Sequence, residues 1–182
     1  MRTHIVYIPG LGNRYNGFRT FALGFWRIYG ASAKLVPVDW YDDDSLEQKM
    51  NLVKEVISQA NPGARVVVIG ESAGATLALR AALFSNVSRV ITLCGVTQPN
   101  TPISPYLQKK APALLQSTRQ IPNTQGKDVH SLRAAVDSIV GKKYSTATGA
   151  KPHKIWILGH LTTIVICLTI LAPLMVTIAK KP

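Results

Sequence analysis

The sequence predicts an α/β fold, arranged as a three-layer sandwich with a mostly parallel sheet of about six strands and helices on both faces. Two observations support this prediction. Short apolar runs that favour strands alternate with helical segments instead of clustering. In addition, the chain has 182 residues, of which 47% are hydrophobic and 16% charged, a composition that excludes a disordered chain. We therefore expect a single domain over residues 1–182, large enough to bury a proper core.

The first half of the chain begins with a short β-rich run and continues with a helix, a strand and a second helix. The first helix has apolar residues at helical spacing, namely Phe18, Phe21, Ala22, Phe25 and Ile28 or Tyr29. Asp44 or Ser45 can cap the second helix, and the acidic residues near its start suit the helix dipole. The expected elements are strand His4–Ile8, helix Gly17–Tyr29, strand Lys34–Val38 and a helix from Ser45 to Ala60.

The second half continues the alternation around one irregular stretch. Residues 96–127 are rich in proline and polar residues, and one short helix is expected there, around Tyr106–Thr118. Such a lid-like insertion would lie above the carboxyl edge of the sheet, where loops carry function. The other expected elements are a strand from Arg65, a helix over Ser72–Phe84, and strands Arg89–Leu93, Val129–Val136 and Lys154–Leu158.

The most informative motif is the turn Gly70-Glu71-Ser72-Ala73-Gly74, which joins the strand from Arg65 to the helix that follows. So sharp a turn leaves no room for side chains at Gly70 and Gly74, and it pushes the serine oxygen out over the strand end. The N-terminus of the following helix supplies unpaired N–H groups for a developing oxyanion. Ser72 is therefore a candidate nucleophile, the alternative being a plain structural turn.

A serine nucleophile needs a histidine within hydrogen-bond reach, oriented by a third group. His4 and His130 begin their strands and His153 precedes the last strand, so all three lie at the wrong edge of a parallel sheet. Only His160 follows the carboxyl end of a strand, after Gly159, which lets the chain turn.

The orienting acid must emerge at the same edge of the sheet. Asp137 ends the strand Val129–Val136 and fits this requirement, whereas Asp128 stands at the beginning of that strand. The other acidic residues, Asp39 and the run Asp42-Asp43-Asp44, precede the candidate nucleophile in the chain.

With the serine turn, Asp137 and His160 in this order, nearly the whole chain resembles a compact member of the α/β-hydrolase family of serine hydrolases. The resemblance implies the family's fold without its amino-terminal hairpin, and the chain order Ser, Asp, His, which sets aside the acids before Ser72. It implies a catalytic triad of Ser72 as nucleophile, Asp137 as orienting acid and His160 as base. No cofactor and no metal are expected.

The resemblance also implies an oxyanion hole. In this family one donor is the N–H after the nucleophile, here Ala73, and the other comes from a loop after an early strand. Pro9-Gly10-Leu11-Gly12 matches that loop in place, with Leu11 as the expected second donor. This sequence departs from the HGGG run of many lipases and esterases, so the second donor rests on position alone.

The carboxyl-terminal segment is apolar, with no charged residue from Leu161 to Ala179. Its length reaches the lower range of a membrane span. The competing interpretation, which we favour, is a single apolar helix over residues 161–179 that packs on the sheet after His160. Threonines dilute the segment, Pro173 would kink it, and its departure to a bilayer would uncover one flank of the sheet.

The net charge of +12 is concentrated in the second half, where 13 Lys and Arg stand against only Asp128 and Asp137. A basic surface of this kind can meet nucleic acid, an anionic membrane surface or an acidic substrate, but the interpretation we favour is a solvated basic surface without a specific partner. The lysines are scattered, without interleaved aromatic residues, so no nucleic-acid partner is expected. Cys94 and Cys167 have no metal-ligand or redox spacing. The amino terminus lacks the pattern of a secretory signal, which predicts a cytoplasmic protein, with membrane association through residues 161–179 as the alternative.

The leading functional hypothesis is therefore a serine hydrolase, a carboxylesterase or lipase-like enzyme acting on a small-molecule or lipid ester, or on a thioester. The alternatives are a membrane-associated lipase or lysophospholipase-like enzyme held by the apolar tail, a non-catalytic binding protein on the same fold, and a membrane-anchored structural protein. The sequence leaves the substrate and the oligomeric state open.

Overall fold

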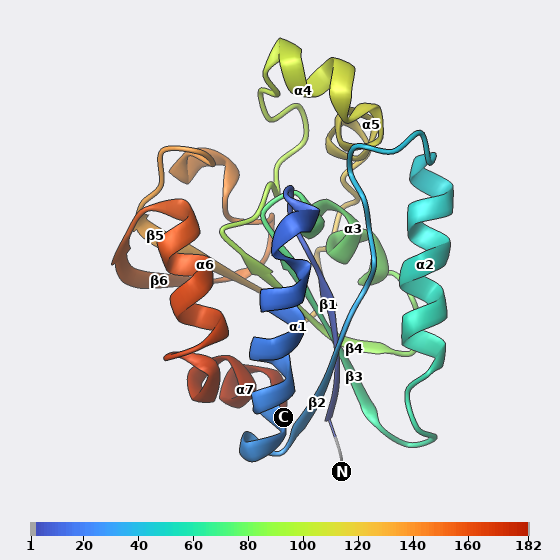
Figure 1. The fold of residues 1–182 in the computed structure, drawn as a ribbon, viewed down its shortest axis with the longest axis vertical. Coiled ribbons are helices and arrows are strands. Elements are labelled where there is room, and N and C mark those ends of the chain that lie inside the picture. The colour runs from blue at the N-terminus through green and yellow to red at the C-terminus, as the bar shows by residue number, and fades with distance from the viewer. Residues whose placement is uncertain (1–2, 182) are drawn as a thin grey trace.

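The computed structural model describes residues 3–181 and contains one six-stranded sheet in which every neighbouring pair of strands is parallel (Figure 1). The strand order is β2-β1-β3-β4-β5-β6, which places β3 and β4 at the centre. This architecture confirms the predicted fold class. The strands are β1 (Thr3–Ile8), β2 (Ala31–Leu35), β3 (Arg65–Glu71), β4 (Val87–Leu93), β5 (Val129–Val136) and β6 (Lys151–Leu158).

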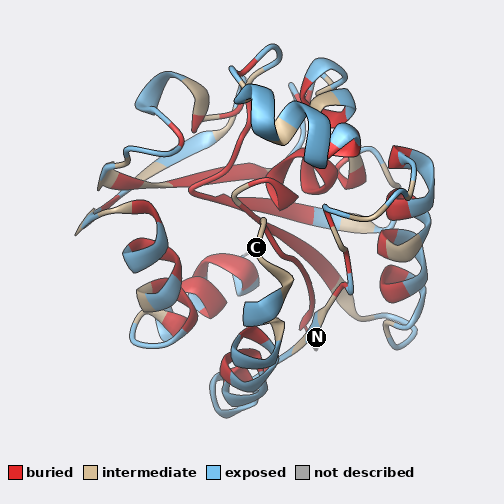
Figure 2. Cartoon of the chain, turned by 45° about the horizontal axis from the view of Figure 1, so that its top comes forward, coloured by how far each residue is buried: buried red, intermediate tan, exposed pale blue. Residues whose placement is uncertain are grey.

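Helices cover both faces of the sheet and enclose two separate apolar cores (Figure 2). One core lies under α1, α6 and α7, and the other lies under α2, α3 and α5. The helices are α1 (Asn16–Phe25), α2 (Leu46–Ser58), α3 (Gly74–Ala81), α4 (Pro105–Lys110), α5 (Pro112–Arg119), α6 (His160–Leu168) and α7 (Ala172–Lys180), with 3₁₀ turns η1 (Asn13–Tyr15), η2 (Trp26–Tyr29) and η3 (Lys142–Tyr144).

Local sequence explains several element ends. Ser45 caps α2 in a reciprocal capping box with Gln48, so Ser45 and not Asp44 is the cap. Strand β2 begins at Ala31, earlier than the expected Lys34, because Gly30 ends η2 with a left-handed φ of 77° and pairing with β1 starts at once. Helix α3 begins at Gly74, two residues later than expected, because Ser72 belongs to the turn itself.

Residues 96–127 extend beyond the carboxyl edge of the sheet at α4 and return to the amino edge at Gly126 and Lys127, so only part of the segment lies where the lid-like insertion was expected. They contain two short helices, α4 and α5, in place of the single one expected (Figure 1). The break falls at Ala111, which precedes Pro112 and has a non-helical backbone. Proline disfavours the helical conformation in the residue before it, and it starts α5 instead. The side chains of Ala111 and Leu114 anchor the segment in the core shared with α2 and α3.

Helix α1 does not bury the apolar side chains at the spacing noted in the sequence. Its buried face consists of Arg19, Ala22 and Leu23, and Trp26 continues that face into η2. Phe18, Phe21 and Phe25 are exposed, so of the expected stripe only Ala22 enters the core. Arg19 donates to the buried Glu71, and Trp26 donates to the buried carbonyl oxygen of Leu168. These two bonds turn the side of the helix that carries Arg19 and Trp26 toward the sheet, so the phenylalanines on the other side face outward.

The apolar tail, expected as one helix over residues 161–179, forms two helices bent by 74°. The chain breaks after Leu168, and Pro173 lies in the first turn of α7. The bend lets both helices pack on the sheet, with Cys167 and Met175 fully buried. Within residues 3–181 no single helix is long and apolar enough to cross a membrane. Only α6 and α7 taken together, as a bent pair, have the required length and composition.

Candidate active site

Ser72 lies in a tight turn between β3 and α3 and has a left-handed backbone, with φ of 49°. The two glycines of the turn are sterically required. A Cβ on Gly74 would lie 2.3 Å from the Ile8 carbonyl oxygen, and one on Gly70 would lie 2.6 Å from both Ala75 and Ala78. A non-glycine residue with positive φ is costly and is retained where the surroundings enforce it. The predicted serine turn is therefore present as a strained strand-to-helix connection.

Three side chains form a continuous hydrogen-bonded chain at this turn. His160 Nε2 lies 2.9 Å from Ser72 Oγ, and His160 Nδ1 lies 2.7 Å from Asp137 Oδ2. The side chains of His160 and Asp137 are only 3% and 5% exposed. The structure thus brings together the three residues that the sequence places at the carboxyl ends of β3, β5 and β6.

The elements around the histidine and the acid fix both side chains. His160 is the first residue of α6, and Gly159 makes the turn from β6 with φ of 92°. Asp137 directly follows β5, and its second oxygen, Oδ1, accepts hydrogen bonds of 2.9 Å from the backbone amides of Ile139 and Val140. Both oxygens of the carboxylate therefore have partners, which leaves it one orientation toward the imidazole.

The loop Pro9-Gly10-Leu11-Gly12 closes over the serine turn. A Cβ on Gly10 would lie 2.8 Å from Ser72 Cβ, so the loop and the serine are in direct contact. Within residues 3–181 the backbone amides of Leu11 and Ala73 donate to no protein acceptor. The Ala73 amide stands at the N-terminus of α3, where the helix dipole favours negative charge. Two free N–H groups are therefore available beside Ser72.

A buried ion pair that sequence reasoning missed lies directly behind this loop. The Arg19 guanidinium binds both carboxylate oxygens of Glu71, with Nε–Oε2 of 2.9 Å and Nη2–Oε1 of 2.5 Å. Glu71 is 1% exposed and precedes Ser72, while Arg19 is 4% exposed and comes from α1. The sequence contained a signal for it, because Arg19 stands at helical spacing with Ala22, Leu23 and Trp26.

The same ion pair ties the loop to the turn. Glu71 accepts hydrogen bonds from the Tyr7 hydroxyl at 2.7 Å and from the Gly10 amide at 3.3 Å. Arg19 donates to the carbonyl oxygen of Gly12 at 3.0 Å. Burial, reinforced by the negative charge of Glu71, raises the pKa of Tyr7 well above its ordinary value. Glu71 is thus a structural link between the two strand ends that flank Ser72.

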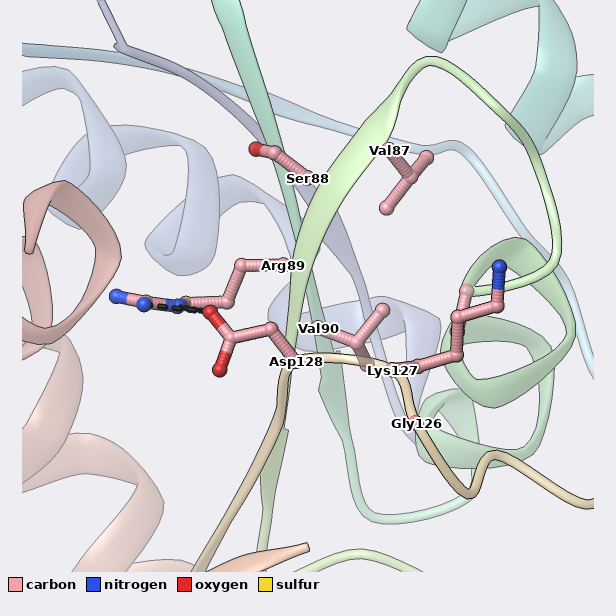
Figure 3. A pocket seen from close by; sticks show the side chains of 8 residues that line it. Val87, Ser88, Arg89, Val90, Gly126, Lys127 and Asp128 are labelled. Carbon is pink, nitrogen blue, oxygen red and sulfur yellow. Dashed lines mark hydrogen bonds and ion pairs between the residues drawn. The ribbon is translucent and has the colours of Figure 1, made fainter. Parts of the chain in front are cut away.

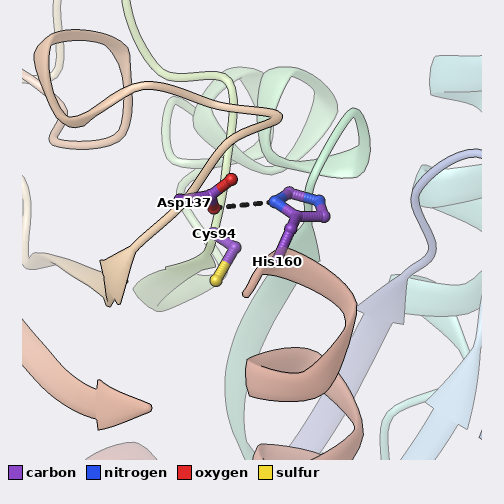
Figure 4. Close-up of side chains that lie close together, drawn as sticks. All are labelled: Cys94, Asp137 and His160. Atoms are coloured by element: carbon purple, nitrogen blue, oxygen red, sulfur yellow. Dashed lines mark hydrogen bonds and ion pairs between the residues drawn. The ribbon is translucent and has the colours of Figure 1, made fainter. Parts of the chain in front are cut away.

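Cys94 lies next to Asp137 and His160, and ligand atoms of the three lie within 4.8 Å of one another (Figure 4). Metal binding requires a thiolate, and burial raises the pKa of the Cys94 thiol to about 12. The Asp137 and His160 atoms that face each other are already joined by a hydrogen bond. The thiol is therefore protonated at neutral pH and forms part of the wall behind the imidazole.

A groove of about 530 Å³ begins beside the site. Leu11 from the loop and Leu161, which directly follows His160, both line it. Two exposed tyrosines, Tyr15 and Tyr41, supply aromatic surface. Charged residues, Arg14 and Asp39, also line the groove, so its surface is both apolar and polar.

The remaining histidines lie at the amino edge of the sheet, as expected. His130 Nδ1 and His153 Nε2 are 2.8 Å apart, and His130 Nε2 lies 3.2 Å from Asp128 Oδ1. Figure 3 shows Asp128 paired with Arg89 beside a cavity of about 290 Å³ at this edge. No serine hydroxyl hydrogen-bonds to these histidines within the described residues, so the cavity lacks the arrangement found at Ser72.

The fold is similar to solved structures of several hydrolases. A pyrethroid hydrolase from Sphingobium faniae has a TM-score of 0.69 and 14% identity over 99% of this chain and 98% of its own. A metagenomic carboxyl esterase has a TM-score of 0.67 and 14% identity over 97% of this chain and 75% of its own.

A third similar structure is described as a putative hydrolase of the α/β superfamily from Xanthomonas campestris pv. campestris. It has a TM-score of 0.64 and 14% identity over 97% of this chain and 98% of its own. No protein-family model and no curated protein matches the sequence. Identities this low show the fold alone, and together with the all-parallel sheet and its helices on both faces they establish that the chain has the α/β-hydrolase fold.

Proposed function

We propose that this protein is a serine hydrolase that cleaves a carboxylic ester or thioester through an acyl-enzyme. The observation that carries the proposal is the hydrogen-bonded series from Ser72 through His160 to Asp137, at the top of a strained strand-to-helix turn. The names of two similar structures, a carboxyl esterase and a Paleococcus ferrophilus monoacylglycerol lipase, support ester chemistry for this fold.

In the first step, the Ser72 hydroxyl gives its proton to His160 Nε2 as Oγ attacks the carbonyl carbon of the substrate. Asp137 accepts the Nδ1–H hydrogen bond and stabilises the imidazolium that forms. The oxyanion accepts hydrogen bonds from the Leu11 and Ala73 amides. The tetrahedral intermediate then collapses, and the leaving alcohol or thiol takes the proton from Nε2.

In the second step, water attacks the acyl-enzyme with His160 as base, and the carboxylic acid leaves as Ser72 recovers its proton. The groove at Leu11 and Leu161 receives one arm of the ester, and its exposed tyrosines favour an apolar arm. No step calls on a cofactor.

The test uses a fluorophosphonate probe and p-nitrophenyl acetate with purified protein. We expect the probe to label Ser72 in the wild-type chain, and Ser72→Ala to abolish labelling and lower kcat/KM by about 10⁴-fold or more. Ser32→Ala, an exposed serine on β2, is the matched control and should change neither result. Absence of labelling in the wild-type protein would instead favour a binding protein built on the same fold.

A further inference from the structure

The helix layer formed by α1, η2, α6 and α7 has an unusually apolar outer surface. Seventeen large apolar side chains are exposed within residues 3–181, and nine of them lie on these elements or at the bend between α6 and α7. We call these nine residues the apolar face: Phe18, Phe21, Phe25, Ile28, Tyr29, Leu161, Val165, Ile170 and Leu174.

Aromatic residues dominate the part of the apolar face on α1. Three of the four phenylalanines in the chain are exposed there, and Phe21 is 67% exposed. The rings of Phe21 and Phe25 meet edge to face with centroids 5.0 Å apart. Single exposed apolar residues are ordinary, but a cluster that includes paired aromatic rings marks an interaction surface.

The elements that carry the apolar face contain charges of one sign only. Residues 3–38 and 138–181 contain no aspartate or glutamate, and they include all of α1, η2, β6, α6 and α7. Glu71 neutralises the buried Arg19, and Lys151 is paired with Asp128, whereas the cations that remain accessible around this layer are Arg14, Arg27, Lys180 and Lys181. The nearest acid along the groove is Asp39.

We propose that the apolar face binds the surface of a bilayer that contains anionic phospholipid. Exposed phenylalanine and leucine side chains enter the boundary between headgroups and acyl chains, while lysine and arginine meet the anionic headgroups. A second copy of this chain that docks through the same face fits less well, because that face presents the same positive charge and no acidic residue.

The apolar face adjoins the candidate site. Leu161 follows His160 directly and lines the groove that also contains Leu11 and Tyr15. A bilayer bound to the apolar face therefore lies beside the opening of the groove. A lipid ester can then move from the bilayer through the groove to Ser72 without passing through bulk water. This last step rests on the proposed function, whereas membrane binding itself does not.

Binding is best measured by sedimentation with vesicles, using the Ser72→Ala chain so that turnover plays no part. We expect binding to vesicles of phosphatidylcholine with about a third phosphatidylglycerol, and at least about tenfold weaker binding to phosphatidylcholine alone. Because exposed charges are screened by salt, raising the salt from low to high concentration should weaken binding to the anionic vesicles. Equal binding to both vesicles, or binding to neither, would overturn the proposal.

Matched variants locate the surface. Phe21→Gln with Phe25→Gln should weaken vesicle binding by about tenfold or more, and Arg27→Glu should weaken it by about fivefold. Leu83→Gln, an exposed residue after α3 on the opposite side of the sheet, and Lys109→Glu on α4 make the same chemical changes elsewhere. These controls should bind like the parent, and thermal unfolding should show that every variant is folded.

Two further outcomes would contradict this mode of binding. Retention in the pellet after sodium carbonate extraction of expressed cells would indicate a spanning segment instead of a docked face. Concentration-dependent self-association that the Phe21→Gln and Phe25→Gln pair abolishes, without vesicle binding by the parent, would identify the face as an interface between copies of the chain. If the protein binds vesicles but the fluorophosphonate probe does not label it, the membrane-binding proposal is supported and the proposed hydrolase function is contradicted.

Discussion

The strands β5 and β6 carry a cluster of histidine and aspartate at each end, and the two clusters have different partners. At the carboxyl ends, Asp137 binds His160, and the imidazole reaches Ser72 Oγ at 2.9 Å. At the amino ends, Asp128 and His130 meet His153, and no hydroxyl joins them within the described residues. The two clusters use the same residue types.

Their acids differ most. Asp137 has two backbone amides on one oxygen and the imidazole on the other, so its charge acts mainly on His160. Asp128 binds Arg89 and Lys151 as well as His130, so its charge is already neutralised by side chains. Arg89 also donates to the Ile178 carbonyl oxygen, which links this edge of the sheet to α7.

The comparison teaches that an acid near a histidine does not define an active site. The carboxyl-edge cluster has a hydroxyl within hydrogen-bond distance of the free nitrogen of its imidazole, which is the arrangement that proton transfer requires. The amino-edge cluster is a link among β4, β5, β6 and α7. Separate substitutions should therefore affect activity at one edge and stability at the other.

The largest effect is expected from Asp137→Asn. The amide keeps the size of the side chain but removes the negative charge that stabilises the imidazolium, and it favours the wrong tautomer of His160. We expect kcat for p-nitrophenyl acetate to fall by about 10³–10⁴-fold, with less change in KM. A loss of less than about tenfold would show that Asp137 does not orient the base.

A smaller effect, on stability, is expected from Glu71→Gln. This substitution leaves the Arg19 guanidinium buried without its carboxylate, and breaking such a pair costs about 3 kcal/mol or more. Urea unfolding measures the change. Because Glu71 also accepts from the Gly10 amide, the activity of the folded variant should fall as well. If the free energy of unfolding of the variant stayed within about 1 kcal/mol of wild type, Glu71 would not stabilise the fold as we infer.

How far the sequence predicts these features depends on what each one needs. Ser72, His160 and Asp137 could be found because parallel strands bring their carboxyl ends to one edge, so a position along each strand is enough. The pair Arg19–Glu71 could not be found this way, because it joins two elements 52 residues apart in the sequence. The exposed phenylalanines of α1 were misjudged for the same reason, since the buried partner of Arg19 decides which side of the helix faces the core.

Asp128→Asn, the same substitution at the amino edge, should mainly change stability. Arg89 is 3% exposed and loses its carboxylate, but Asp128 is partly exposed, so water replaces some of the interaction. We expect a loss of about 1–2 kcal/mol in the free energy of unfolding, with kcat/KM at 25 °C within about twofold of wild type. A loss of activity as large as that of Asp137→Asn would erase the distinction between the two edges.

The smallest expected effect is a dependence of stability on pH that comes from the amino edge. Burial, together with the positive charge of Arg89, lowers the pKa of His130 despite the opposing effect of Asp128. Burial and the charges of Lys151 and Lys181 lower the pKa of His153. Both imidazoles are thus neutral in the folded protein at a pH where the unfolded chain already binds protons.

The stability from these neutral imidazoles is therefore fully present above the unfolded pKa of about 6.5 and is lost as the pH falls below it. We expect the Tm of the wild-type protein to drop by a few degrees between pH 7.5 and pH 5.5, and the variant His130→Asn with His153→Asn to lose most of that drop. His4, whose pKa burial and Lys34 also lower, accounts for the remainder. If the double variant kept the full pH dependence, the histidines of the amino edge would not be its source, and the contrast between the edges would rest on Asp128 alone.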